Sequence, residues 1–429
     1  MLPFFTKIQK DYQAFNKHSL WVILSIAIYS FGSGFFDPYF SVFLNSFTTN
    51  YSQLGLLVSV FTFVSALLTI PVGYLMDFVQ YRTMLTIGKV LSVIVAILYF
   101  IAGQYQLLPI LIFALVLNGI AFPFNWTGTE TVLGAYSKKH KTTELFGFYG
   151  SLVNIAWMVG LLIAAFFVVE RYPLHFIFLP LMFFPIFSIL IFNTKLPDNR
   201  HAESFSQGVS QWIRERRITS RFLSDLKVFN GEMWLMMGIA FLEKFIQVAI
   251  TVFIPVVVLK ENASLLQIGL LMALMHVSTL FSFIFAELSN RGVRLLVIVA
   301  GFALTFISCL TLVFASQQYA IFLSALFAIT GLVVAAPSIL GIITKLTPKG
   351  HFGTVTALHT LVRRIGLFVA PIALGSLADH FSMQAVYWFV ALCAGIVVCV
   401  TLFYRFAWIK KDRLYEIEHP NGHKVPYYL

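Results

Sequence analysis

The chain has 429 residues, of which 59% are hydrophobic and 11% are charged. An ordinary soluble domain carries about 25% charged residues and enough polar surface to cover its core, so this composition excludes a soluble protein. The formal net charge of +11 would suggest a nucleic-acid partner only if the basic residues clustered, and their placement indicates a membrane protein instead.

Twelve apolar runs, each bounded by polar residues, glycine or proline, follow one another along the chain. A helix needs about 20 apolar residues to cross a bilayer core, and each run is long enough. The sequence therefore predicts an all-α membrane protein with both termini on one side. The predicted spans are 19–45, 52–76, 83–103, 107–135, 144–169, 173–193, 231–259, 264–288, 294–315, 319–345, 352–378 and 383–407.

Lysine and arginine concentrate in the N-terminal tail, in the loops after even-numbered spans and in the C-terminal tail. Lys138, Lys139 and Lys141 follow the fourth span, whereas the opposite loops contain Arg171 and Lys260. Because cytoplasmic loops carry the excess of positive charge, we expect both termini in the cytoplasm and the protein in the plasma membrane. The first apolar run is longer than a signal-peptide core, which predicts no cleaved leader.

Patterns typical of enzymes or cofactor sites do not occur in the sequence. Cys309, Cys393 and Cys399 all fall inside apolar runs, which favours packing over a disulfide framework or a metal cluster. The Gly88–Lys89 pair opens a span and lacks the upstream glycine of a phosphate-binding loop. The sequence thus predicts no cofactor, no metal and no enzyme. An integral-membrane enzyme and a nontransporting receptor are the alternatives from other classes.

The two halves of the chain resemble each other. YSQLGLLVSV is similar to SLLQIGLLMAL, and the match aligns Gln53 with Gln267 and Gly55 with Gly269. FGFYGSLVNIAWMVG is likewise similar to FGTVTALHTLVRRIG. Six spans followed by six related spans are typical of transporters in which two bundles rock about a shared site. The predicted parts are an N-terminal six-helix bundle (1–193), a cytoplasmic linker (194–230), a C-terminal six-helix bundle (231–407) and a cytoplasmic tail (408–429).

The linker contains an amphipathic stretch. Phe205, Val209, Trp212 and Ile213 recur at helical spacing among several arginines. This pattern favours a helix that lies on the anionic lipids of the cytoplasmic leaflet. A solvated basic linker is the alternative interpretation.

A short motif, GYLMDFVQYR, follows the second span, and a degraded copy, AELSNRGVR, follows the eighth. Together with twelve spans and the repeat, this motif makes the chain resemble the major facilitator superfamily. The resemblance implies that spans one, four, seven and ten line a central cavity. It also implies a conformational latch formed by Gly73, Asp77 and Arg82, in which the glycine allows close helix approach. Ordinary loop charges at Asp77 and Arg82 are the alternative.

Two departures from that superfamily's proton antiporters affect the functional prediction. Their span-four arginine has no counterpart before Gly119, and the proline of their span-five signature has none near Gly160. Both departures weaken a prediction of drug–proton antiport and favour uptake.

Arg363 and Arg364 stand side by side within a predicted span, and Lys244 is the other basic residue assigned to a span interior. An ionised side chain at a helix centre costs about 2.5–3.5 kcal/mol on insertion scales, so these residues are expected to pair, face water or serve transport. Adjacent residues differ by about 100° around a helix, so one arginine can face the cavity while the other bonds elsewhere. We interpret the pair as an anion-recognition element, with structural pairing to acids as the alternative.

The acids within spans are Asp37, Glu130 and Glu243, and His276 adds a group that changes protonation near neutral pH. We predict that these four residues couple transport to protons. Each has a structural alternative: a helix kink at Asp37, a cytoplasmic latch at Glu130, neutralisation of Lys244 by Glu243, and simple packing of His276. The polar residues Asn125, Gln247 and Asn154 are predicted to bind substrate beside the arginines.

These features predict a secondary active transporter that works by alternating access, as a monomer. With cationic and acidic groups opposite each other, the best-fitting solute is a small anionic or amphoteric metabolite that bears a carboxylate, taken up with protons. The alternative is a proton-coupled efflux pump for drugs or other amphipathic compounds, because an aromatic-rich cavity suits lipophilic cations.

Overall fold

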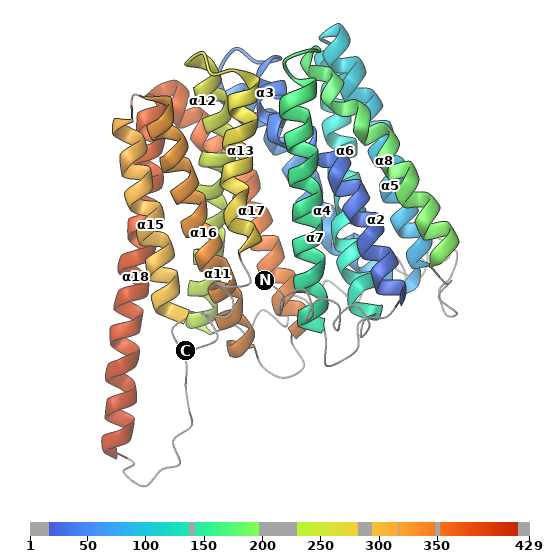
Figure 1. Cartoon of the computed structure of the whole chain (residues 1–429). Coiled ribbons are helices and arrows are strands. Elements are labelled where there is room, and N and C mark those ends of the chain that lie inside the picture. Colours follow the sequence, from blue (N-terminus) through green and yellow to red (C-terminus); the bar gives the residue numbers. More distant parts are fainter. Residues whose placement is uncertain are drawn as a thin grey trace, which may run out of the picture. The chain divides into compact units, whose positions relative to one another are not determined.

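The computed structural model describes residues 17–136, 142–196, 230–281, 294–315, 317–347 and 352–418. Helices make up the architecture of these ranges (Figure 1). Those of the first half are α2 (Lys17–Gly34), η1 (Asp37–Tyr39), α3 (Phe40–Asn45), α4 (Tyr51–Phe78), α5 (Tyr81–Tyr105), α6 (Leu108–Tyr136), α7 (Thr142–Ile163), η2 (Ala164–Val168), η3 (Leu174–Phe178) and α8 (Leu179–Lys195).

The second half repeats the pattern of long apolar helices. They are α11 (Gly231–Val248), η5 (Ala249–Phe253), α12 (Ile254–Lys260), α13 (Leu265–Leu280), α15 (Arg294–Phe314), α16 (Gln318–Leu346), α17 (Phe352–His380) and α18 (Met383–Glu418). Over both halves, the described residues contain 11 helices long and apolar enough to cross a membrane, together with the shorter apolar α13. These helices confirm the predicted spans, except that residues 282–288 of the eighth span lie outside the described ranges.

The last helix is longer than predicted. The apolar run ends at 407, but α18 continues to Glu418 (Figure 1). The extension, KKDRLYEIE, is rich in residues of high helix propensity, so the helix continues after its apolar pattern has stopped. The predicted tail of 408–429 therefore starts as a helix, whereas most of the predicted linker and its amphipathic stretch lie outside the described residues.

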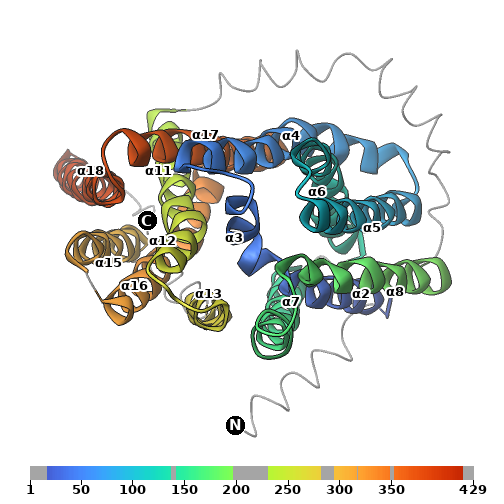
Figure 2. The same cartoon turned by 90° about the horizontal axis from the view of Figure 1, so that it is seen from above.

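The chain forms two compact units, comprising residues 1–47, 60–220 and 264–273 in the first and 48–59, 221–263 and 274–429 in the second. In the first unit α5 packs between α6 and α8, and α2 packs on α7 and α8 (Figure 2). In the second unit α15 packs between α16 and α18, and α11 packs on α16 and α17.

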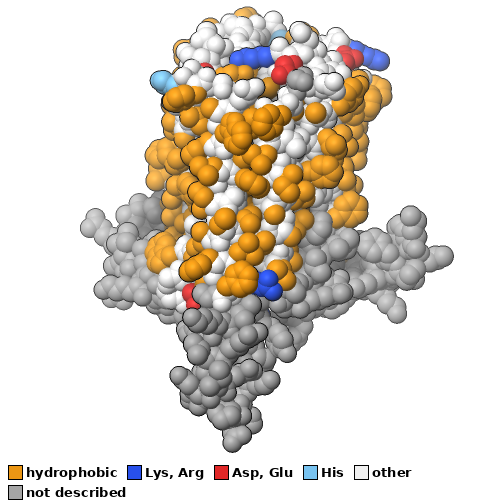
Figure 3. Space-filling view, turned by 90° about the vertical axis from the view of Figure 1, so that its left-hand side faces the viewer, with side chains coloured by type: hydrophobic (Ala, Val, Ile, Leu, Met, Phe, Trp, Pro, Cys, Tyr) orange, Lys and Arg blue, Asp and Glu red, His pale blue; other side chains and the backbone are white. Residues whose placement is uncertain are grey.

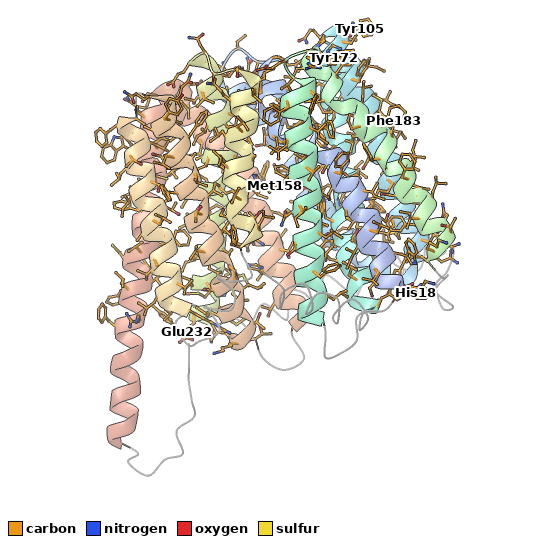
Figure 4. The ribbon with its side chains drawn as sticks, viewed as in Figure 1. His18, Tyr105, Met158, Tyr172, Phe183 and Glu232 are labelled. Atoms are coloured by element: carbon orange, nitrogen blue, oxygen red, sulfur yellow. The ribbon has the colours of Figure 1, made fainter. Side chains whose placement is uncertain are left out.

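The surface of the helices is that of a membrane protein. On the face in Figure 3, hydrophobic side chains cover the middle, and charged side chains lie towards its two ends. In the first unit the exposed Tyr105 and Tyr172 lie at one end and His18 at the other, with Met158 between these levels (Figure 4). Aromatic residues at the ends of spans are typical of side chains that sit at the level of lipid headgroups.

The first helix of each half is interrupted at a proline. Pro38 lies in the 3-10 turn η1 that follows α2, and Pro255 lies at the start of α12 directly after the π-helical turn η5. Proline has no N–H to donate, so the regular helical bonding stops one turn away. Interruptions of this kind leave nearby backbone carbonyls without a helical hydrogen-bond partner. They often occur at functional sites.

The repeated sequence YSQLG/SLLQIG has the same local structure in both halves. The Asn50 side chain accepts from the Gln53 backbone N–H at 2.9 Å, and the Gln53 amide oxygen accepts from Thr49 N at 2.9 Å. In the second copy, Ser264 and Gln267 exchange the corresponding bonds, at 3.2 and 2.8 Å. The second helix thus begins with a capping box. The first begins with a related arrangement, in which the Gln53 side chain bonds to Thr49, one residue before the cap Asn50. Both satisfy backbone N–H groups that the helix itself leaves open.

Candidate functional site

The second unit contains a buried cluster of charged side chains on α11 and α17. The Glu243 carboxylate is 5% exposed and lies 3.0 Å from Lys244 Nζ and 3.3 Å from Arg363 Nε. Arg363 Nη2 also donates to Glu243 Oε1 at 3.5 Å. Two cations therefore share one carboxylate, and the cluster retains an excess positive charge.

A glycine on α17 brings the two helices close enough for this contact. A Cβ on Gly366 would lie 2.7 Å from the Phe241 carbonyl oxygen and 3.3 Å from Lys244 Cβ. Arg363 stands one turn before Gly366 and Glu243 follows Phe241, so the close approach places the guanidinium beside the carboxylate. The predicted alternative, in which Glu243 and Lys244 neutralise each other, accounts for only part of the arrangement, because Glu243 contacts Arg363 as well.

The charged cluster is only partly covered by protein. One third (33%) of the Arg363 side chain and 16% of the Lys244 side chain are exposed, in contrast to the carboxylate between them. Lys244 Nζ also donates to Gln247 Oε1 at 2.5 Å, which brings the predicted polar residue Gln247 into the same cluster. Arg364 is partly buried beside it on α17.

One member of the cluster was not predicted. His359 is 6% exposed on α17 and interacts electrostatically with both Glu243 and Arg363. It precedes Arg363 by four residues, and that spacing places two side chains on the same face of a helix. The sequence therefore contained the information, because His359 lies one turn from the arginine pair.

In the first unit, Asp37 contacts a neutral side chain, that of Trp157. The Asp37 side chain is exposed although it lies within a span, and it accepts a hydrogen bond from Trp157 Nε1 at 3.0 Å. Gly34 and Gly160 explain the contact, since each glycine packs against a backbone carbonyl of the other helix, Trp157 and Phe31 respectively. Larger residues at these positions would separate α2 from α7.

Lys89 is a further basic residue inside a span, at a position where the sequence shows only a Gly–Lys pair without the upstream glycine of a phosphate-binding loop. Lys89 is fully buried on α5, with its Nζ 2.8 Å from Asn125 Oδ1 and 3.6 Å from the centre of the Tyr29 ring. In this structure Asn125, predicted to bind substrate, contacts protein groups instead. Asn125 is 1% exposed, and its amide is occupied by Lys89, Ser92 and backbone carbonyls.

The other predicted polar residues are scattered over their units. Glu130 is exposed on α6 and interacts electrostatically with the buried Tyr149 of α7. Asn154 is partly buried on α7. In the second unit, His276 is partly buried on α13, where its carbonyl accepts from Thr279 Oγ1 at 2.6 Å.

The described residues include only part of the latch predicted from GYLMDFVQYR. Arg82 Nη2 donates to the carbonyl of Leu196, which ties the start of α5 to the end of α8. The side chain of Asp77 lies outside the described residues. A Cβ on Gly73 would meet only Thr127 Cγ2, at 3.8 Å, which is ordinary van der Waals contact, so in this structure Gly73 leaves room for a side chain.

Comparison with known proteins agrees with this architecture. The model of the Major Facilitator Superfamily matches residues 22–278 and 233–415. The uncharacterised MFS-type transporter MJ1560 of Methanocaldococcus jannaschii is 21% identical over 378 residues, which cover 85% of this chain and 92% of that protein.

Two solved structures have a similar fold. A point mutant of the nucleoside transporter NupG superposes with a TM-score of 0.73 at 12% identity, over 90% of this chain and 99% of that one. A D-xylose–proton symporter superposes with a TM-score of 0.68 at 15% identity, over 90% and 96% of the two chains.

Proposed function

The chain belongs to the major facilitator superfamily, and we propose that it takes up a small anionic or amphoteric metabolite that bears a carboxylate. Transport is secondary active, proceeds by alternating access and is driven by protons. The proposal places the protein in the plasma membrane with both termini cytoplasmic, where it acts as a monomer.

The observation that carries the proposal is the exposed part of Arg363 in a cluster with two cations and one carboxylate. A guanidinium offers a planar pair of donors to a carboxylate, and Glu243 occupies only part of them. A substrate carboxylate that approaches the exposed side of Arg363 gains a charge-assisted bond without leaving Glu243 unpaired. We assign Arg363, Arg364 and Gln247 to substrate recognition, with Asn154 as a further polar contact in the first unit.

Proton coupling is assigned to Asp37, Glu130, Glu243 and His276. A proton on a carboxylate removes a charge that would have to be desolvated when the pathway closes, so proton binding and substrate binding can together permit the transition. The solved structure of similar fold is a D-xylose–proton symporter, which supports this form of coupling in the present chain. Gly73, Asp77 and Arg82 remain the proposed latch of the cytoplasmic side.

Efflux of lipophilic cations is the weaker proposal. The excess positive charge of the Glu243–Lys244–Arg363 cluster would repel such a compound. An anionic group, in contrast, is attracted by the same charges.

The test is uptake by sealed proteoliposomes that contain the purified protein, with an inward proton gradient. Radiolabelled lactate, succinate, glutamate and alanine sample anionic and amphoteric carboxylates. We expect Arg363→Ala and Arg364→Ala each to abolish most uptake of whichever solute the wild type accumulates, and Arg363→Lys to recover only part, because an ammonium cannot bind a carboxylate through two parallel N–H groups.

Arg405→Ala is the matched control, because Arg405 is a partly buried arginine near the end of the apolar part of α18, far along the chain from the cluster. Its uptake should equal that of the wild type. If both Arg363→Ala and Arg364→Ala accumulate the solute normally, recognition by the arginines is excluded.

A further inference from the structure

A buried lysine in the first unit has an environment built for a cation but without a counter-charge. The Lys89 ammonium has an amide oxygen at 2.8 Å and an aromatic face at 3.6 Å, and its contacts include no carboxylate of a described residue. Both contacts stabilise positive charge, one as a hydrogen bond and the other as a cation–π interaction. A structural lysine buried in a membrane protein would be expected to pair with an acid.

The orientation of the amide oxygen is fixed by the rest of the cage. Asn125 Nδ2 donates to Ser92 Oγ at 2.8 Å, and it also lies 3.1 to 3.2 Å from the carbonyls of Ala121 and Gly88. Three acceptors around Nδ2 leave Oδ1 as the atom that faces Lys89. Gly88 makes the arrangement possible, because a Cβ there would lie 2.9 Å from Phe124 Cβ.

The cage supplies fewer acceptors than an ammonium has donors. Lys89 carries three N–H groups, and among described residues one oxygen, Asn125 Oδ1, accepts from them. The helices around it place neutral groups against Lys89: α2 contributes Tyr29 and α6 contributes Asn125. Their titratable residues lie elsewhere, with Lys17 and His18 at the start of α2, the exposed Glu130 on α6 and Lys195 at the end of α8. A lysine held in this way can exist with or without its proton, and buried lysines commonly serve as proton acceptors.

We propose that the Lys89 amine is a proton-binding site that loads and releases one proton in each transport cycle. In the closed cage the ammonium is fully buried and the proton is retained. When α5 and α6 separate at Gly88, the ammonium gives one proton to water and becomes a neutral amine, and the reverse step reloads it. This inference rests on the proposed proton-coupled function, to which it adds a site outside the carboxylates already assigned.

Two substitutions test whether the Lys89 side chain must gain and lose a proton. Lys89→Arg keeps a permanent charge and Lys89→Met keeps a side chain of similar length without one. If proton exchange at Lys89 is required, both variants lose proton-driven accumulation in proteoliposomes, whereas both retain counterflow of the same labelled solute without a gradient. Normal accumulation by Lys89→Arg would show that a fixed charge is enough, and normal accumulation by Lys89→Met would show that none is needed; either result overturns the proposal.

A structural role gives a different result. If both variants elute and unfold like the wild type but lose counterflow as well, Lys89 is needed for more than the proton and the proposal fails. Should the two variants not fold, Asn125→Asp tests the same idea, because the new carboxylate holds the lysine permanently charged. Its loss of accumulation with counterflow retained supports the proposal, and wild-type accumulation overturns it.

Proton binding can also be measured without a solute, so failure of the proposed substrate class is distinguishable. A potentiometric titration of the purified protein in detergent, between about pH 5 and pH 8.5 where an ordinary lysine keeps its proton, should show one more titrating proton per chain in the wild type than in either Lys89→Arg or Lys89→Met. Equal titrations would exclude exchange at Lys89, even if wild-type proteoliposomes accumulate a carboxylate. A difference of one proton would support the site even if no tested solute moves.

Discussion

The two units use opposite means to keep a cation within the membrane. In the second unit, Lys244 and Arg363 share the carboxylate of Glu243, at 3.0 and 3.3 Å. In the first unit, Lys89 is held by the oxygen of Asn125 and the ring of Tyr29, both neutral. Lys89 is fully buried, whereas a third of the Arg363 side chain is exposed.

From this difference we infer that Arg363 and Lys89 have different functions. An exposed cation next to a satisfied carboxylate can attract an anion from water, because its own charge is already partly balanced when the site is empty. A buried cation with a neutral cage has no access to a solute in this structure, but it can change its own charge by losing a proton. On the two proposals above, the same superfamily scaffold carries a recognition element in one half and a proton-exchange element in the other.

Glu243→Gln is expected to have the largest effect, because it leaves Lys244 and Arg363 together without a counter-charge. Removing one partner of a fully buried ion pair typically costs about 3–5 kcal/mol, and we expect the lower end of this range because Arg363 is one third exposed and Lys244 keeps its bond to Gln247. We expect a loss of this size in the free energy of unfolding, measured by denaturation in detergent micelles, and loss of uptake. Glu232→Gln in the first turn of the same helix is the control and should have little effect.

The double variant Glu243→Gln, Arg363→Gln tests the cause. With one cation removed as well, Lys244 keeps its bond to Gln247 and much of the lost stability should return. If the double variant is as unstable as the single one, the carboxylate stabilises α11 in some way other than by charge.

The twelve spans, the helical fold and the superfamily could be predicted from sequence because they depend on long apolar runs and on a repeat. The repeat extends to local hydrogen bonds, since the amide oxygens of the aligned Gln53 and Gln267 each accept from a backbone N–H at the start of their helix. The aligned glycines both allow close packing, Gly55 against the Pro371 carbonyl and Gly269 against the Tyr39 hydroxyl. Local hydrogen bonding is encoded by neighbouring residues, and so the sequence predicts it well.

The next largest effect is expected at the neutral cage that Asn125 and Tyr29 form around Lys89. Asn125→Leu removes the oxygen that accepts from Lys89 and the donors to Ser92 and two carbonyls, so we expect a loss of about 1–3 kcal/mol, the usual cost of leaving a buried polar group unsatisfied. Lys89→Met in the same background removes the unsatisfied ammonium, and the double variant should recover part of the loss. A double-mutant cycle of unfolding free energies gives the coupling between the two residues.

A coupling at this cage as large as that between Glu243 and Arg363 would contradict the distinction between the units. It would mean that the amide oxygen stabilises the ammonium as well as a carboxylate does. Absence of any coupling would show that Tyr29 alone holds the cation.

Lys89 shows why the candidate site could be predicted only in part. It lies inside the predicted span 83–103, but its meaning depends on Asn125, 36 residues later, and on Tyr29 from another helix. Likewise, the polar stripe around Asn125 predicted a substrate ligand, and the structure turns that side chain to Lys89 instead. Which polar residues meet inside a bundle depends on helix rotation and on close glycine contacts, and one sequence does not contain that information in a short pattern.

The smallest expected effect concerns the hydrogen bond between Trp157 and Asp37 in the first unit. Trp157→Phe keeps an aromatic ring but removes the N–H that donates to Asp37 Oδ2 at 3.0 Å. A typical hydrogen bond contributes about 0.5–1.5 kcal/mol, and the exposed carboxylate can be hydrated in its place, so the loss should lie at the low end of that range.

Trp126→Phe on α6 is the matched control for Trp157→Phe, because the Trp126 ring packs on Phe122 and loses no bond to a carboxylate. The same unfolding measurement compares the two variants. A loss for Trp157→Phe near that of Glu243→Gln would mean that water does not replace the indole at Asp37. The first unit would then depend on a neutral donor as strongly as the second depends on its cations, and Asp37 would have to exchange its proton from a dry site, as proposed for Lys89.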